Sequence, residues 1–305
     1  MNYWLPLLLA CHPSPSDKDE VQETGSGDST TDSNNDSGDT SPPCQDFSEI
    51  LEECEQRVRP IEGAPTDYYD GINELTENLI EVLHAKIDSH QSRSFDALWE
   101  VFPQTDARDD GTVWDVYSDT PGSLPSYSYE FETDRCGNYQ HEGDCFNREH
   151  TWPSSWFGGG SPMKSDLFHV VPTDGYVNNR RGSRPYGVVA SARWTSDNES
   201  KVGPSSQCGY TREVFEPRDD FKGDLARGFF YMATRYRGED SQWDSSDATQ
   251  GATIEPWAED LLRAWHIQDP VDLKEIARND AVYGIQGNRN PFIDHPEWVC
   301  VISDF

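Results

Sequence analysis

The sequence predicts an α+β protein built as a single domain. Strand-length runs rich in β-branched and aromatic residues lie in the middle of the chain, at 113–117, 127–131 and 167–171. Segments whose apolar residues recur every three or four positions lie on both sides of these runs. Beyond a polar N-terminal stretch, about 260 residues remain, which is enough for one well-buried domain.

The helices follow from this periodicity and from capping signals. Asp174 or Thr173 can cap the helix that follows the third strand, and Pro270 is expected in the first turn of the last helix. Polar or glycine-rich segments at 106–111, 158–160 and 288–290 are expected to be turns or loops. The predicted helices, in chain order, span 47–57, 67–89, 94–102, 174–180, 221–236, 255–267 and 271–285.

The first 43 residues are expected to lie outside the folded domain. Residues 1–10 form a short apolar leader, and Leu8-Leu9-Ala10-Cys11 has the form of a lipoprotein processing site, with Cys11 as the lipidated residue. Residues 12–43 contain a single apolar side chain, Val21, so they cannot bury enough surface to offset ordering entropy. We therefore expect a signal peptide at 1–10, a lipid-anchored acidic tether at 11–43 and a monomeric domain at 44–305. The expected location is the outer membrane or cell surface, or otherwise the periplasm or the medium.

The chain is strongly acidic, with a formal net charge of −32. Residues 44–305 still carry 48 Asp and Glu against 23 Lys and Arg, and the whole chain has 18 arginines but only 6 lysines. Such a lysine-poor acidic surface favours a halophilic origin, because concentrated salt screens self-repulsion beyond roughly 3–8 Å. An ordinary acidic exported protein is the alternative.

The cysteines indicate an oxidising compartment. Without Cys11, six remain, and an even number fits three disulfides. Short loops favour Cys136–Cys145 and Cys44–Cys54, which leaves Cys208–Cys300. A structural zinc site is the rival interpretation, because Cys136, His141, Cys145 and His150 have the order and spacing of a four-ligand set.

The residues most informative about function lie between Asn147 and Gly187. Arg148, Glu149 and His150 place a cation, a hard oxygen ligand and a base side by side, and Asn178 to Arg181 supply two carboxamides and two guanidiniums. Between Arg148 and Arg193 there are six Lys or Arg against three Asp or Glu. A basic island in so acidic a chain suggests a polyanionic substrate.

Five motifs follow one another along the chain: NREHTWP at 147–153, SDLFH at 165–169, PTDGYVNNR at 172–180, FYMATRY at 230–236 and QGNRNPFIDHPE at 286–297. In this order they resemble the bacterial endonuclease I family, exported nucleases of the His-Me finger (ββα-metal) class. Where members of that family often have Asp-Leu-His-His, this chain has Phe168 in place of the first histidine. The similarity extends from about residue 68 to about residue 297.

The resemblance implies a ββα-metal core surrounded by helices, and cleavage of DNA, with RNA as a second candidate substrate, that has little sequence preference and leaves 5′-phosphates. It assigns His150 as the general base and Glu149 with Asn178 as ligands of one Mg²⁺, for which Mn²⁺ or Ca²⁺ can substitute. The residue chemistry agrees: a neutral imidazole suits a base, and carboxylate and amide oxygens suit Mg²⁺. We also expect Arg181 to contact the phosphate, with Arg148, Arg180 and Arg184 as further substrate contacts. The alternative function is an inactive surface lipoprotein that binds nucleic acid or another polyanion.

Overall fold

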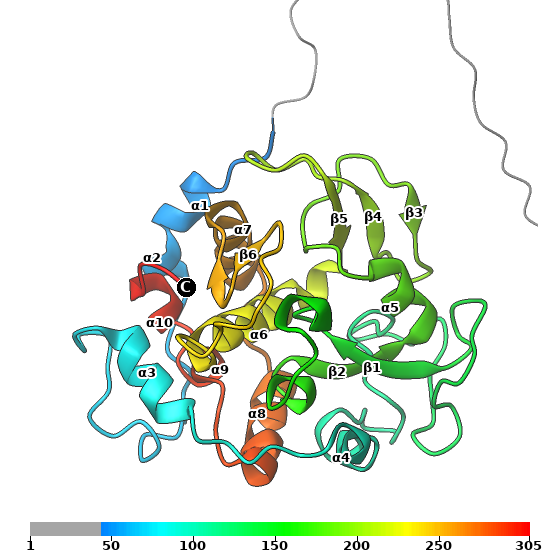
Figure 1. Cartoon of the computed structure of the whole chain (residues 1–305), viewed down its shortest axis with the longest axis horizontal. Coiled ribbons are helices and arrows are strands. Elements are labelled where there is room, and N and C mark those ends of the chain that lie inside the picture. The colour runs from blue at the N-terminus through cyan, green and yellow to red at the C-terminus, as the bar shows by residue number, and fades with distance from the viewer. Residues whose placement is uncertain (1–43) are drawn as a thin grey trace, which may run out of the picture. The chain divides into compact units, whose positions relative to one another are not determined.

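The middle of the chain forms an antiparallel ribbon of two strands that leads directly into a helix. In the computed structural model, which describes residues 44–305, strand β1 (Phe146–His150) pairs with β2 (Val170–Asp174), and Glu149 lies opposite Val171. Helix α5 (Gly175–Arg181) begins at the next residue, and the Asp174 side chain caps it by accepting from Val177 N at 2.7 Å. The cap predicted at Asp174 is thus confirmed. The ribbon and the helix pack together, in agreement with the predicted α+β class (Figure 1).

Helix α6 (Lys222–Arg235) is the centre of the hydrophobic core. All of its fourteen residues except Asp224 are buried, and the buried charges of Lys222, Arg227 and Arg235 are each matched by an ion pair. It packs against α3, α7 and α9. Figure 1 shows it running through the middle of the fold. Trp152 contacts this core through Phe229, with ring centroids 5.0 Å apart, so the residues that follow β1 are anchored to α6.

The N-terminal helices are shorter than the periodicity predicts. Helices α1 (Ser48–Glu52) and α2 (Cys54–Arg57) confirm the first predicted helix, and η1 (Phe95–Ala97) with α4 (Leu98–Thr105) confirms the third. The helix predicted over 67–89 is reduced to α3 (Leu79–Ile87).

Side chains explain why the first half of 67–89 is not helical. The Asn73 and Thr76 side chains accept hydrogen bonds from Leu75 N and Asn73 N, both at 2.9 Å, and so compete with helical bonding. Asn78 then adopts φ 53°, a left-handed conformation that ends the turn segment just before α3.

The strands predicted at 113–117 and 127–131 do not form. The two segments share a backbone bond, Val113 N to Tyr129 O at 2.9 Å, but no ladder follows. Asp115 accepts from Tyr117 N at 2.9 Å, which turns the backbone where a strand would have continued. The third predicted strand, 167–171, is displaced, because residues 167–169 form a turn and β2 begins at Val170.

Two small sheets lie outside the ribbon. One has the order β3 (Trp194–Thr195), β4 (Lys201–Pro204) and β5 (Glu213–Glu216), and the other pairs β6 (Thr249–Gln250) with β7 (Thr253–Ile254), all antiparallel. Short 3₁₀ turns, η2 (Ser154–Phe157), η3 (Met163–Ser165) and η4 (Asp219–Phe221), occupy the connections.

The C-terminal third is helical, as predicted. It contains α7 (Pro256–Gln268), α8 (Leu273–Gln286), α9 (Pro291–Asp294) and α10 (Trp298–Val301). Helix α8 starts with a capping box between Asp272 and Glu275, so Pro270 lies before the cap rather than in the first turn. Asn290 caps α9, which confirms the capped turn expected at 288–290.

Three disulfides cross-link the domain, and only one has the expected pairing. Cys136 bonds Cys145, but Cys44 bonds Cys208 and Cys54 bonds Cys300, so the Cys44–Cys54 and Cys208–Cys300 pairs were wrong. Tertiary contacts override loop length here: a parallel bridge joins Gln45 to Gln207, and α2 packs on α10. Because Cys136 and Cys145 are bonded, the zinc interpretation is also wrong.

The expectations for residues 1–43, including lipidation of Cys11, lie outside the described residues. Within 44–305, no helix combines the length and the apolar character that a bilayer crossing requires.

Candidate active site

Glu149 and His150 end strand β1 and point to opposite faces of the ribbon. Adjacent strand residues alternate in this way, and His150 is the last residue of β1. Glu149 points inward and is 3% exposed, whereas His150 is half-buried at the edge beside the 163–165 turn. A site that uses both must therefore lie at the end of the strand.

Glu149 is a buried carboxylate with one oxygen committed to the protein. Its Oε1 accepts from Arg181 Nη1 at 2.7 Å and from Tyr117 Oη at 2.9 Å. Neither Arg181 nor Tyr117 bonds the other oxygen, Oε2. Burial raises the pKa of the Glu149 carboxyl, and the positive charge of Arg181 opposes that rise. The arrangement supplies a charged oxygen ligand held in a fixed orientation.

Asn178 lies on α5 on the same side of the ribbon as Glu149. Its Nδ2 donates to Asn147 Oδ1 at 2.7 Å, and Asn147 precedes Glu149 by two positions on β1. Because the amide nitrogen is engaged, the carbonyl oxygen Oδ1 is the atom that remains to bind a ligand. A carboxylate oxygen and an amide oxygen are hard ligands, which fits Mg²⁺ with its other positions filled by water and phosphate. Among residues 44–305 there is no cluster of three or more His, Cys, Asp or Glu suited to a metal.

His150 is held in one tautomer by the protein. Its Nε2 lies 3.0 Å from the Lys164 carbonyl, which can only accept, so Nε2 carries the proton and Nδ1 has the free lone pair. The ring stacks on Phe95, with centroids 5.4 Å apart and planes 22° apart. Burial, with a smaller contribution from His169, lowers the pKa of His150 to about 3, which keeps the imidazole neutral at pH 7.

Arg181 does not offer the phosphate contact that we expected. It is fully buried, and besides Glu149 its guanidinium donates to the His150, Thr151 and Arg184 carbonyls at 2.8, 2.5 and 3.1 Å. A helix position one turn after Asn178 brings it behind the carboxylate rather than to the surface. In this structure Arg181 therefore stabilises Glu149.

The other expected substrate contacts differ in how far their charges are engaged. Arg148 lies 3.6 Å from the Phe95 ring centroid and donates to Phe95 O at 2.6 Å, and Arg184 pairs with Glu213 at 3.0 Å. Arg180 is exposed and donates to Tyr176 Oη at 2.5 Å, with no carboxylate of the described residues in ion-pair range. Of the four arginines, Arg180 is thus the most available to a phosphate.

Sequence reasoning missed Lys164. It is exposed, its own carbonyl receives the His150 hydrogen bond, and no carboxylate of the described chain pairs with it. Its ammonium lies 5.3 Å from the centroid of the Phe95 ring, and the same ring stacks with His150. The available signal was its position as the single cation in the long loop between the two strands.

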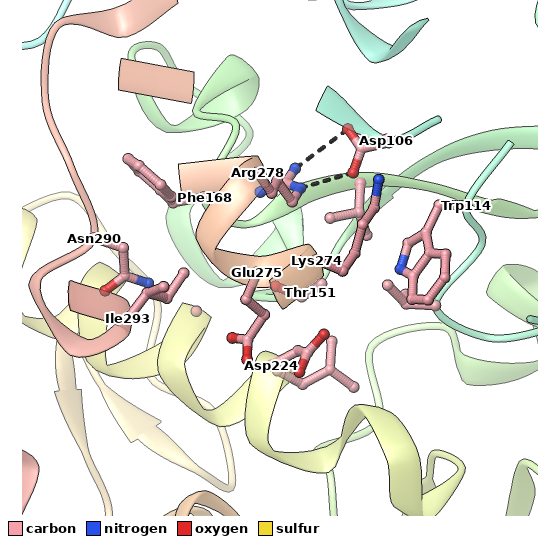
Figure 2. Close-up of a pocket in the computed structure, with 14 residues that line it drawn as sticks. Asp106, Trp114, Thr151, Phe168, Asp224, Lys274, Glu275, Arg278, Asn290 and Ile293 are labelled. Carbon is pink, nitrogen blue, oxygen red and sulfur yellow. Dashed lines mark hydrogen bonds and ion pairs between the residues drawn. The ribbon is translucent and has the colours of Figure 1, made fainter. Parts of the chain in front are cut away.

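A small pocket of about 50 Å³ is a separate feature (Figure 2). Its lining includes Thr151 and Phe168, but not Glu149, His150 or Asn178. Two of the charged groups around it are paired: Arg278 points at Asp106, with Nε 2.7 Å from Oδ1 (Figure 2), and Glu275 pairs with Arg227 at 2.6 Å. Phe168, which stands where members of the family often have a histidine, packs on Tyr231 with ring centroids 4.5 Å apart. These contacts support the core rather than a ligand.

Comparison with known proteins identifies the family of the chain. The model of the Endonuclease I family matches residues 76–297. An extracellular ribonuclease of Bacillus subtilis (strain 168) is 35% identical over 245 residues, which cover 77% of this chain and 78% of the relative. An extracellular ribonuclease of Bacillus amyloliquefaciens is 34% identical over 249 residues, 79% of each chain. An extracellular deoxyribonuclease of Aeromonas hydrophila is 27% identical over 137 residues, 43% of this chain and 50% of the relative. The chain belongs to the endonuclease I family and is an endonuclease.

Proposed function

We propose that the protein is an exported, metal-dependent endonuclease that hydrolyses both RNA and DNA with little sequence preference. The observation that carries the proposal is the fixed tautomer of His150, whose Nδ1 is the free base at the end of β1. RNA is included because the two relatives that align over more than three quarters of their length are named ribonucleases, while shorter matches are named deoxyribonucleases. Low sequence preference follows if contacts go mainly to phosphates.

In the proposed reaction, His150 Nδ1 takes a proton from the attacking water, and Nε2 keeps its hydrogen bond to Lys164 O throughout. Glu149 Oε2 and Asn178 Oδ1 would hold one Mg²⁺, which supplies charge stabilisation at the phosphate and at the leaving oxygen. Arg181 and Tyr117 keep the Glu149 carboxylate oriented, and Asn147 keeps the Asn178 amide oriented. Lys164 and Arg180 are proposed to contact the flanking phosphates.

Export and the N-terminal arrangement belong to the same proposal. Three disulfides fit an oxidising compartment, and relatives are named extracellular or periplasmic. We propose a leader at 1–10, a lipid at Cys11, a tether up to residue 43 and a monomeric nuclease domain at 44–305. Mass spectrometry of the membrane fraction tests the lipid: the expected result is a diacylated or triacylated N-terminal peptide that begins at Cys11.

The nuclease proposal is tested on supercoiled plasmid and on a fluorescent RNA, each with Mg²⁺ and with EDTA. Wild type should cut both substrates, EDTA should stop both reactions, and His150→Ala should lower turnover by about 10²–10⁴-fold with the fold intact. Activity of His150→Ala within a few-fold of wild type would remove His150 from the mechanism. An enzyme that binds both polymers but cuts neither would instead support the inactive polyanion-binding lipoprotein.

A further inference from the structure

The orientation of His150 depends on one short turn, Met163–Ser165 (η3). The Lys164 carbonyl in this turn accepts from His150 Nε2, so any movement of the turn moves or releases the imidazole. The Lys164 side chain is exposed, so the position of its carbonyl is set by the neighbouring residues. The question is which side chains fix the turn.

The His169 side chain, which lies beside His150, also binds this turn. It is fully buried, and its Nε2 donates to the Met163 carbonyl at 2.6 Å. The two imidazoles have ring centroids 5.5 Å apart and bind consecutive carbonyls of the same turn. The backbone strengthens this coupling, because Thr151 N, directly after His150, donates to His169 O at 2.9 Å.

The residues after Lys164 are anchored by side-chain contacts that do not involve the His169 imidazole. Ser165 Oγ donates to Arg93 O at 2.5 Å. Asp166 is fully buried and accepts from Tyr231 and Tyr236 hydroxyls at 2.9 and 2.8 Å on Oδ2, and from Gln286 Nε2 at 3.1 Å on Oδ1. The C-terminal side of the turn is therefore held by contacts with α6, α8 and residue 93. On its N-terminal side, the side chain that binds the turn is His169, through the Met163 carbonyl.

We propose that His169 is a positioning residue for the general base: by holding Met163 O, it places Lys164 O so that His150 keeps Nε2–H and presents Nδ1. This inference rests on the proposed role of His150 as the base. It assigns no contact between His169 and substrate or metal. Its effect should appear in the tautomer of His150 and in kcat, and not in substrate or Mg²⁺ affinity.

The experiment compares His169→Ala with His169→Gln and His169→Asn in the full chain. A glutamine amide can reach the Met163 carbonyl as Nε2 does, whereas the asparagine amide is too short. The first readout is the ¹⁵N spectrum of labelled histidine without metal or substrate, with the His150 signals assigned from their loss in His150→Ala. The second is kcat and KM on plasmid, with Mg²⁺ affinity from calorimetry. His266→Ala is the matched control, because His266 is also buried and its Nε2 donates to a carbonyl, Pro296 O at 3.0 Å, away from the site.

We expect wild type, His169→Gln and His266→Ala to show the Nε2–H tautomer of His150. His169→Ala and His169→Asn should show mixed tautomers and a kcat lower by about ten- to a hundredfold, with KM and Mg²⁺ affinity within about twofold, because loss of orientation costs rate rather than binding. If His169→Ala does not fold, the Gln and Asn variants decide the matter. A wild-type tautomer and kcat in His169→Asn would overturn the inference, as would an effect of the same size in His266→Ala. Full activity of His150→Ala would instead overturn the proposed base, while the spectra would still report the coupling.

Discussion

Arg181→Met tests whether Arg181 acts from inside the fold. The guanidinium is fully buried and donates to the Glu149 carboxylate and to three backbone carbonyls. Methionine has a comparable length but neither charge nor donors, so Glu149 would remain buried with Tyr117 as its one side-chain donor among the described residues. Removing one partner of a buried ion pair costs about 3–5 kcal/mol. A typical domain has only about 5–15 kcal/mol in total, so the variant should be marginally stable.

The assay is urea unfolding at pH 7 in EDTA, followed by kinetics at a temperature where each variant is folded. We expect the free energy of unfolding to fall by about 3–5 kcal/mol, and kcat to fall as well because Glu149 loses its fixed orientation. Arg289→Met is the control: Arg289 is also buried, pairs with Asp294 at 2.7 Å and lies outside the site, so it should lose stability but keep kcat. An exposed arginine would cost no more than about 0.5 kcal/mol. A loss that small in Arg181→Met, together with a raised KM, would refute the argument and restore Arg181 as a substrate contact.

Three further predictions follow from the site and its surroundings. Glu149→Ala and Asn178→Ala should each weaken Mg²⁺ binding, and excess Mg²⁺ should partly restore their rates; unchanged calorimetric affinity in both would place the metal elsewhere. Reduction should inactivate the enzyme, because the Cys136–Cys145 loop contributes about 2–4 kcal/mol next to β1, and peptide mapping without reductant should recover the Cys44–Cys208 and Cys54–Cys300 pairs. Burial and the charge of Asp174 raise the pKa of Asp115 to about 7, so the native state keeps a proton that the unfolded chain releases near pH 4. Asp115 therefore favours the native state most below about pH 4 and progressively less up to about pH 7; the stability advantage of wild type over Asp115→Asn should shrink across that window, and an advantage constant with pH would contradict the assignment.

Local signals predicted those parts of the fold that depend on local chemistry. The cap at Asp174, the helices at α6, α7 and α8, and the turn at Asn290 depend on residues a few positions apart, so they could be read from the chain. The absence of a strand at 113–117 could not be predicted from local residues. Asp115 accepts a hydrogen bond from the backbone two residues on, and it is held in place by Thr173 and Asp174, which are far away in the sequence. The two missed disulfides have the same cause, since the Gln45–Gln207 bridge is a tertiary contact.

The candidate site divides in a similar way. Glu149, His150 and Asn178 could be named because carboxylate, imidazole and carboxamide side chains carry recognisable chemistry. The buried orientation of Arg181 could not be predicted, since an arginine at the end of an amphipathic helix usually reaches solvent. Lys164 contributes its carbonyl to His150, and backbone atoms leave no trace in a sequence pattern.

The Cys44–Cys208 bond lies where mechanical load would enter the domain. A pull on the chain from upstream reaches the fold at its first described residues, and the covalent link carries that force to residue 208, beyond strand β4 and before β5. Helix α1 is then not pulled away from α7, and α2, which packs on α1 and α10, is held by the Cys54–Cys300 bond. A load applied upstream of residue 44 therefore passes into a covalent link before it reaches the noncovalent contacts that hold α1.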